Sequence, residues 1–314
     1  MIETWDIEEI PPLRDALSVY SDHSFFTLSS DYGVTELIAP PQMVQLRHRY
    51  RDDILRQKVD LKKQMANFVG NSVHRSLEWY LSTFQAREHQ QKYLVETKLF
   101  DMVLGRRIAG KIDVWRDEIL YDYKTTSTFK YIKQDFEDYE KQGNVYAYLL
   151  RTYKKQVKAF RIILIFTDWS KKLVFQERGY PKQNFVMIEL DNLWHEDKQR
   201  QYYHGRVKLM IEAEQADDDE LPLCTVQEMW AKPNSWAVYG TDQGPETGSK
   251  AKRVVESREE ADNFIRNNPK KVGESPTIQF RPGHRMRCEE YCDVSGYCRQ
   301  FTEYMDEKQS AEDE

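Results

Sequence analysis

The segment 159–167, with the sequence AFRIILIFT, is an almost unbroken apolar run. A strand with one wet face alternates apolar and polar side chains, whereas a strand covered on both faces is apolar at nearly every position. The run therefore predicts a strand inside a sheet that is packed on both sides. Helical stretches at about 65–86 and 131–153 precede it in the chain.

Three further strands are expected between these two helices. Residues 92–99 alternate in polarity, and 107–115 and 119–125 form two strands joined at Asp117-Glu118. The order helix, three strands, helix, strand is typical of an α/β fold with a mixed central sheet flanked by helices. The same patterns predict a helix from Pro40 and Pro41 to about Lys63, strands at 172–178 and 184–190, and a helix at about 191–214.

An acidic segment divides the chain. Residues 212–220, EAEQADDDE, carry six acidic side chains and no basic one, and we interpret them as a linker. The linker separates a domain at 1–211, with a helical N-terminal part, from a cysteine-containing region at 221–301 and an acidic tail at 302–314. In the second region the sequence predicts a hairpin, 236–239 with 251–255, and a helix at 257–267, which make a small α+β region.

The charge distribution is compatible with a nucleic-acid partner. The net charge is -6, but residues 212–220 and 302–314 hold twelve acidic side chains and one basic one. The remainder has 40 acidic and 45 basic side chains and is mildly basic. Residues 47–63 carry seven Lys or Arg against three Asp, which indicates either a solvated helix face or a helix that contacts phosphates.

The sequence also limits the compartment. It contains no apolar run of about 18 residues, so no membrane span is expected. The first residues are acidic and lack the apolar core of a secretion signal, which predicts a cytoplasmic protein. In a reducing compartment the four cysteines are expected to be thiols or metal ligands rather than disulfides.

The predicted hairpin GKIDVWRDEILYDYKTT brings acidic side chains together. If Asp117-Glu118 is a two-residue turn, Asp113 faces Asp122 at a Cβ separation of about 4.5–5.5 Å. Lys124 projects from the same face as Asp122. The two carboxylates repel each other unless a cation lies between them, and Mg²⁺ with a nearby lysine suits phosphodiester hydrolysis. The alternative is a solvent-facing polar strand.

Other candidate residues are individually more typical of packing. His74 precedes Leu77 and Leu81 by three and seven residues, so its helix face turns inward. Glu96 lies in the strand before the hairpin. Gln142 and Tyr146 are four residues apart and share one helix face.

Taken together, these residues resemble the PD-(D/E)XK nuclease superfamily, specifically its RecB-type and lambda-exonuclease-like branch. The resemblance covers about residues 65–170. Its pieces follow in order: G-x-x-x-H-x-x-L-E at 70–78, a strand Glu at 96, G-x-I-D at 110–113, D-Y-K-T at 122–125 and Q-x-x-x-Y at 142–146.

The resemblance implies a fold and a set of roles. The fold is a restriction-endonuclease-like core. Asp113 and Asp122 would hold Mg²⁺ or Mn²⁺, with His74 as a further ligand, and Lys124 would be the catalytic lysine. The same resemblance gives Gln142 and Tyr146 the task of orienting the lysine region and the DNA strand.

The cysteines suggest a second metal centre. Cys288, Cys292 and Cys298 form a C-x3-C-x5-C cluster that the distant Cys224 can close into one four-coordinate site, which would staple the C-terminal region. Relatives with C-x2-C-x5-C near the C-terminus imply a [4Fe-4S] cluster. The longer first gap and the position of Cys224 after the core leave structural Zn²⁺ as the alternative, with His284 as a substitute ligand. The third interpretation of the four cysteines is that they are unrelated free thiols.

These observations predict a metal-dependent DNA nuclease, most typical of an exonuclease acting on linear or single-stranded ends in recombination, repair or DNA degradation. Because no helicase P-loop occurs, the chain looks like the stand-alone nucleases of bacteriophages and their hosts, which act in the host cytoplasm. A recombination or single-strand-binding protein would be a natural partner. The alternatives are an endonuclease of the same fold, a non-catalytic nucleic-acid-binding module, and an RNA nuclease.

Overall fold

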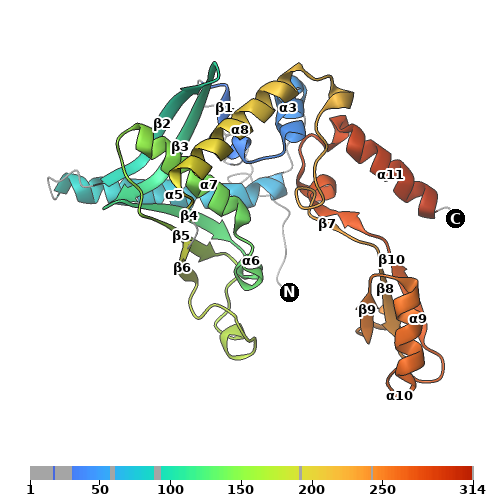
Figure 1. The fold of residues 1–314 in the computed structure, drawn as a ribbon. Coiled ribbons are helices and arrows are strands. Elements are labelled where there is room, and N and C mark those ends of the chain that lie inside the picture. Colours follow the sequence, from blue (N-terminus) through green and yellow to red (C-terminus); the bar gives the residue numbers. More distant parts are fainter. Residues whose placement is uncertain are drawn as a thin grey trace. The chain divides into compact units, whose positions relative to one another are not determined.

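A computed structural model of the protein describes residue 17 and residues 30–56, 61–87, 93–190, 193–241 and 243–312. Of the helix predicted from Pro40 to about Lys63, residues 57–60 lie outside these ranges. The chain divides into two compact units, one formed by residues 1–45 and 51–216 and the other by residues 46–50 and 217–314 (Figure 1). None of the described helices combines the length and apolarity of a membrane span.

A mixed six-stranded sheet forms the centre of the first unit, as predicted. β3 pairs with β2 at every residue except Asp113, so β1 and β4 share the other edge of β3. β5 and β6 continue the sheet beyond β4. The β1–β3 and β4–β5 pairs are parallel and the others antiparallel. The strands are β1 (Tyr32–Gly33), β2 (Tyr93–Val103), β3 (Arg106–Arg116), β4 (Ile119–Thr126), β5 (Ala159–Phe166) and β6 (Phe185–Leu190).

The β3–β4 hairpin has the predicted turn. Arg116 pairs with Ile119, which leaves Asp117 and Glu118 as the two loop residues. Their φ angles are 52° and 65°, the positive values of a type I′ turn, whose twist matches that of the flanking strands. The register of the hairpin is therefore fixed by local geometry.

Helices cover both faces of the sheet. Helix α5 (Leu61–Arg87) packs against β4 so closely that a Cβ at Gly70 would lie 2.9 Å from Thr125 Oγ1. Helix α7 (Glu137–Thr152) lies on the opposite face, where a Cβ at Gly143 would lie 2.1 Å from the ring of Phe160. Helix α8 (Glu196–Gln215) packs beside α7 (Figure 1). The short α2 (Val34–Leu37) and α3 (Pro41–Arg49) complete this core.

Three predictions about these elements were wrong. The helix expected at 131–153 is two helices, α6 (Thr128–Lys133) and α7, because Gln134 adopts a left-handed conformation with a φ of 54°. The strand expected at 172–178 is a loop with one 3-10 turn, in which Phe175 is 82% exposed and finds no strand partner. β5 is fully buried only on its α7 face, and its other side chains are half-buried.

The helix predicted from Pro40 to Lys63 also differs. It ends at Arg49, and α4 (Arg51–Arg56) begins after Tyr50. The ring of Tyr50 stacks on that of Tyr297 at 4.2 Å, so this residue packs within the second unit.

The second unit holds a small antiparallel sheet. β8 (Ser235–Tyr239) pairs with β9 (Arg253–Val255), which confirms the predicted hairpin, and also with β10 (Thr277–Arg281), which was not predicted. Helix α9 (Arg258–Asn267) packs on this sheet over a core of Val238, Ala261 and Val272. The remaining elements are α10 (Pro269–Val272), the paired strands β7 (Ala231–Lys232) and β11 (His284–Arg285), and helix α11 (Arg299–Glu312).

The acidic segments are partly helical. Residues 212–215 form the last turn of α8, and Asp218–Glu220 form a 3-10 turn. Residues 302–312 belong to α11, which is held by the Tyr304 hydroxyl donating to Glu289 at 2.8 Å. Lys308 pairs with the same carboxylate at 3.0 Å. The acidic residues between 302 and 312 are therefore part of helix α11.

Candidate active site

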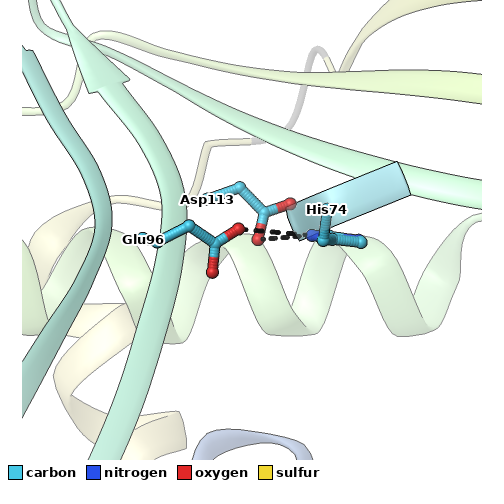
Figure 2. Close-up of side chains that lie close together, drawn as sticks. All are labelled: His74, Glu96 and Asp113. Carbon is cyan, nitrogen blue, oxygen red and sulfur yellow. Dashed lines mark hydrogen bonds and ion pairs between the residues drawn. The ribbon is translucent and has the colours of Figure 1, made fainter. Parts of the chain in front are cut away.

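Three ionisable side chains from three elements converge in the first unit (Figure 2). His74 comes from α5, Glu96 from β2 and Asp113 from β3. His74 Nδ1 lies 3.4 Å from Glu96 Oε1 and 3.5 Å from Asp113 Oδ1. One ligand atom of each residue lies within 4.8 Å of those of the other two, which is the spacing that a shared metal ion requires.

Glu96 reaches this group through an unusual backbone. The β2–β3 ladder pairs Val95 with Val114 and Thr97 with Ile112, so Glu96 and Asp113 lie level with each other but unpaired. Glu96 has a φ of 44°, in the left-handed region. A non-glycine residue there costs on the order of 1–3 kcal/mol, and such strain is concentrated at functional sites. With this backbone conformation the Glu96 carboxylate reaches His74.

Asp113 and Asp122 do not face each other as directly as the hairpin predicted. The β3–β4 ladder stops at Val114 and Tyr121, one pair before the two aspartates. Beyond that point Asp113 Oδ2 accepts a hydrogen bond of 2.6 Å from the backbone N–H of Tyr123. The side chain thus replaces the strand pairing, and the strands separate at the site.

Asp122 is held by Lys124 instead of joining the group around His74. Lys124 Nζ lies 2.7 Å from Asp122 Oδ2, so the two side chains share a face as predicted. Among the described residues, the group whose ligand atoms all lie within 4.8 Å of one another is His74, Glu96 and Asp113. The ligand set predicted from the sequence, His74, Asp113 and Asp122, therefore shares two residues with this group and stays a prediction.

The site carries strongly perturbed charges. Burial raises the pKa of Asp122 to about 6, although the Lys124 ammonium opposes this shift. Hydrogen bonds to Asp113 and Glu96 raise the pKa of His74 to about 10. Burial lowers the pKa of Lys124, but the charge of Asp122 outweighs it and the net pKa is raised. Lys124 is therefore a cation at neutral pH.

The donor set fits a divalent cation. Glu96 Oε2 and Asp122 Oδ2 are buried, and apart from ion pairs with Lys111 and Lys124 they have no hydrogen-bond partner among the described residues. Carboxylate oxygens of this kind are the ligands preferred by Mg²⁺ and Mn²⁺. His74 adds a nitrogen donor once a cation displaces its proton.

Gln142 and Tyr146 support β3 from α7. Both are buried, and burial raises the pKa of the Tyr146 hydroxyl, a shift that Gln142 and the Lys111 backbone oppose. β3 pairs with β1 up to Ala109 and with β4 from Val114 onward. Between these two residues no described strand pairs with this edge of β3, and Tyr146 packs there instead. The ring of Tyr146 packs closely against Gly110, where a Cβ would lie only 2.7 Å from Tyr146 Cε1.

Comparison with known proteins agrees with this geometry. The sequence pattern of the PD-(D/E)XK nuclease superfamily matches residues 35–299. The chain belongs to this superfamily. Membership implies a nuclease, and the mixed sheet flanked by helices is consistent with the restriction-endonuclease-like fold of PD-(D/E)XK proteins.

Other comparisons are distant. One solved structure, "Crystal structure of SSO0001", is similar to this PD-(D/E)XK chain at 15% sequence identity, with a TM-score of 0.41 over 65% of this chain and 87% of that one. No curated protein sequence matches the chain significantly.

The four cysteines of this PD-(D/E)XK chain lie in its second unit, and none forms a disulfide. Burial raises the pKa of Cys224 to about 12, and the charges of Cys298, Cys288 and Cys292 add to the effect. In the described part of the chain, however, no three of the four Sγ atoms lie within 4.8 Å of one another, unlike the ligand atoms of His74, Glu96 and Asp113. The side-chain amide of Gln300 fixes Cys224 by two hydrogen bonds of 2.9 Å to its backbone.

His284 and the basic stretch have other partners. His284 Nδ1 lies 3.5 Å from Glu289 Oε1. Arg47 forms a two-pronged ion pair with Asp293, with distances of 2.8 and 2.7 Å. Arg49 lies 2.5 Å from Asp218. These arginines hold the second unit together, which favours a structural role over phosphate contact.

Proposed function

We propose that this chain is a divalent-metal-dependent DNA nuclease that acts as an exonuclease on DNA ends. The observation that carries the proposal is the convergence of His74, Glu96 and Asp113 beside the Asp122–Lys124 pair. Because the chain belongs to a nuclease superfamily, we assign phosphodiester hydrolysis to this cluster.

Each residue has a task in the proposed reaction. His74, Glu96 and Asp113 would hold the cation, with Asp122 as a further carboxylate ligand. When bound, the cation supplies an activated water and neutralises charge on the phosphate. Lys124, cationic and fixed by Asp122, would orient the attacking water and stabilise the negative charge that develops on the phosphate oxygens.

The exonuclease assignment rests on the motifs shared with the RecB-type and lambda-exonuclease-like branch. G-x-x-x-H at 70–74, D-Y-K at 122–124 and Q-x-x-x-Y at 142–146 occur together in that branch. We further propose a role in DNA recombination, repair or degradation, in the host cytoplasm if the gene is a phage gene. A recombination or single-strand-binding protein is the expected partner.

We also propose that the cysteines hold one metal centre. The support is the C-x3-C-x5-C spacing of Cys288, Cys292 and Cys298, with Cys224 as the fourth thiol, because thiolates at such spacings are typical metal ligands. Burial raises the pKa of Cys288 to about 11, and the positive charges of Arg285 and Arg287 oppose this shift. A [4Fe-4S] cluster is the first assignment and structural Zn²⁺ the alternative.

The test uses end-labelled linear DNA and covalently closed circular DNA of the same sequence, each incubated with Mg²⁺, Mn²⁺ or EDTA. An exonuclease releases nucleotides or short products from linear DNA and leaves the closed circle intact, and EDTA stops it. Nicking or opening of the circle instead supports the endonuclease alternative. DNA binding without cleavage in either metal supports the non-catalytic module and contradicts the proposal.

A further inference from the structure

A second lysine lies next to the proposed catalytic lysine. Lys130 Nζ is 4.4 Å from the centre of the Tyr139 ring, and Lys124 Nζ is 5.4 Å from the same centre. The two ammonium groups are therefore no further apart than the sum of these distances. Lys124 is on β4, whereas Lys130 is on α6, the helix that begins directly after this strand.

The position of Lys130 is fixed by the start of α6. Asp168 accepts hydrogen bonds from the Thr128 backbone N–H at 2.7 Å and from the Thr128 hydroxyl at 3.1 Å. One turn later the ring of Tyr131 packs edge-on against Phe166 of β5 at 5.7 Å. These contacts tie α6 to the sheet and leave Lys130 on a half-exposed surface.

The two lysines differ in their electrostatic partners. Lys124 is neutralised by Asp122 at 2.7 Å, whereas no ion pair found in the described part of the chain includes Lys130. The Tyr139 ring attracts an ammonium group without neutralising its charge. Lys130 therefore offers an uncompensated positive charge beside the acidic centre.

We propose that Lys130, held on the Tyr139 ring, binds a DNA backbone phosphate adjacent to the scissile one. This inference rests on the proposed nuclease function. Successive phosphates of one strand advance about 3.4 Å along a duplex, so a strand whose scissile phosphate lies at Lys124 brings a neighbouring phosphate within reach of Lys130. The subsite positions the strand and takes no part in the chemical step.

The test measures binding of a labelled oligonucleotide over a series of salt concentrations. All variants carry Asp113→Asn, so that DNA stays intact in Mg²⁺. Lys130→Gln should reduce the magnitude of the slope of log K against log salt by about 0.7 to 0.9, the value for one lost phosphate contact, and should weaken binding about five-fold. Lys130→Arg should restore both values, because it keeps the charge.

Lys155 provides a matched control, because its Nζ lies 4.9 Å from the centre of the Trp115 ring near the hairpin turn. Lys155→Gln also removes one positive charge that lies over an aromatic ring, and it should leave the slope of log K against log salt unchanged. An unchanged slope in Lys130→Gln, or an equal loss in Lys155→Gln, overturns the subsite. In the otherwise wild-type chain, Lys130→Gln should raise KM with little change in kcat, as expected when ground-state and transition-state binding are lost equally.

Failure of the subsite and failure of the proposed function give different results. If the wild-type chain cleaves no DNA in either metal, the nuclease proposal fails. If it cleaves DNA and Lys130→Gln binds and cleaves like its parent, only the subsite is wrong. Tyr139→Leu, which removes the ring that holds Lys130, should reproduce the Lys130→Gln slope, and a parent-like slope contradicts the role of the ring.

Discussion

Replacing Gly110 by alanine tests the contact between the G-x-I-D and Q-x-x-x-Y motifs. An added Cβ would lie 2.7 Å from both Tyr146 Cε1 and Val34 Cγ2. Separations under 3.0 Å essentially never occur for a Cβ. Tyr146 and Val34 are 6% and 2% exposed, so neither can swing into solvent. Gly110→Ala must therefore displace β3, α2 or α7.

The size of the effect follows from two opposing terms. Overpacking a buried site costs about 1–3 kcal/mol. Alanine in place of glycine recovers about 0.4–1 kcal/mol by restricting the unfolded chain. We expect a net destabilisation of about 0.5–2 kcal/mol, and for a unit of this size about 2–4 °C of Tm is lost per kcal/mol.

Urea and thermal unfolding of Gly110→Ala, Tyr146→Leu and the double variant measure this contact. Because leucine removes the ring atoms that the new Cβ meets, Gly110→Ala should cost at least about 0.5 kcal/mol less in the Tyr146→Leu background. Gly205→Ala is the control. An added Cβ there meets no atom within 4 Å, and alanine at this exposed position of α8 should stabilise the helix by about 1 kcal/mol. Strictly additive costs, or a fully stable Gly110→Ala, would refute the reasoning.

Three further predictions concern the metal centres and the buried charge. His74→Ala should slow cleavage and be partly rescued by raised Mn²⁺, and the absence of any rescue in a Mn²⁺ titration would remove His74 from the ligand set. In EDTA the free energy of unfolding should fall as pH rises from about 4 to above 6, because burial raises the pKa of folded Asp122 to about 6 and the folded state binds the proton more tightly. Asp122→Asn should flatten this dependence in urea titrations at several pH values, and an unchanged slope would contradict it. Cys224→Ser and Cys298→Ser should each lower the Tm by a similar amount and expose the second unit to protease. Anaerobic purification should yield either iron with acid-labile sulfide or one zinc, and four freely titrating thiols with no metal would disprove the centre.

Local rules were sufficient for the hairpin and its lysine. A two-residue turn at Asp117 and Glu118 and the alternation of side chains place Lys124 beside Asp122, and the structure has both features. Neither depends on distant parts of the chain. The pairing stops before Asp113, however, because that carboxylate caps the Tyr123 backbone N–H, which no spacing rule predicts.

The remaining features depend on tertiary context. The left-handed conformation of Glu96 has no sequence signal, because glutamate favours it no more than other residues do. Its position in the ordered set of motifs was the only indication. The sequence left open whether Arg47 belongs to a solvated helix face or contacts phosphates, because its partner, Asp293, lies far away in the sequence. The charge of a stretch thus gives no information on which of its side chains are already paired.

The central claim is that Asp113 belongs to a metal-dependent centre that cleaves DNA. Asp113→Asn keeps the size of the side chain but removes one negative charge from the group around His74. Asp117→Asn makes the same change at the exposed tip of the same hairpin, where asparagine tolerates the positive φ. The decisive measurement is the single-turnover rate of cleavage of linear DNA in Mg²⁺ by the two variants. The account predicts a loss of at least about 100-fold for Asp113→Asn and a wild-type rate for Asp117→Asn. A wild-type rate for Asp113→Asn would contradict it.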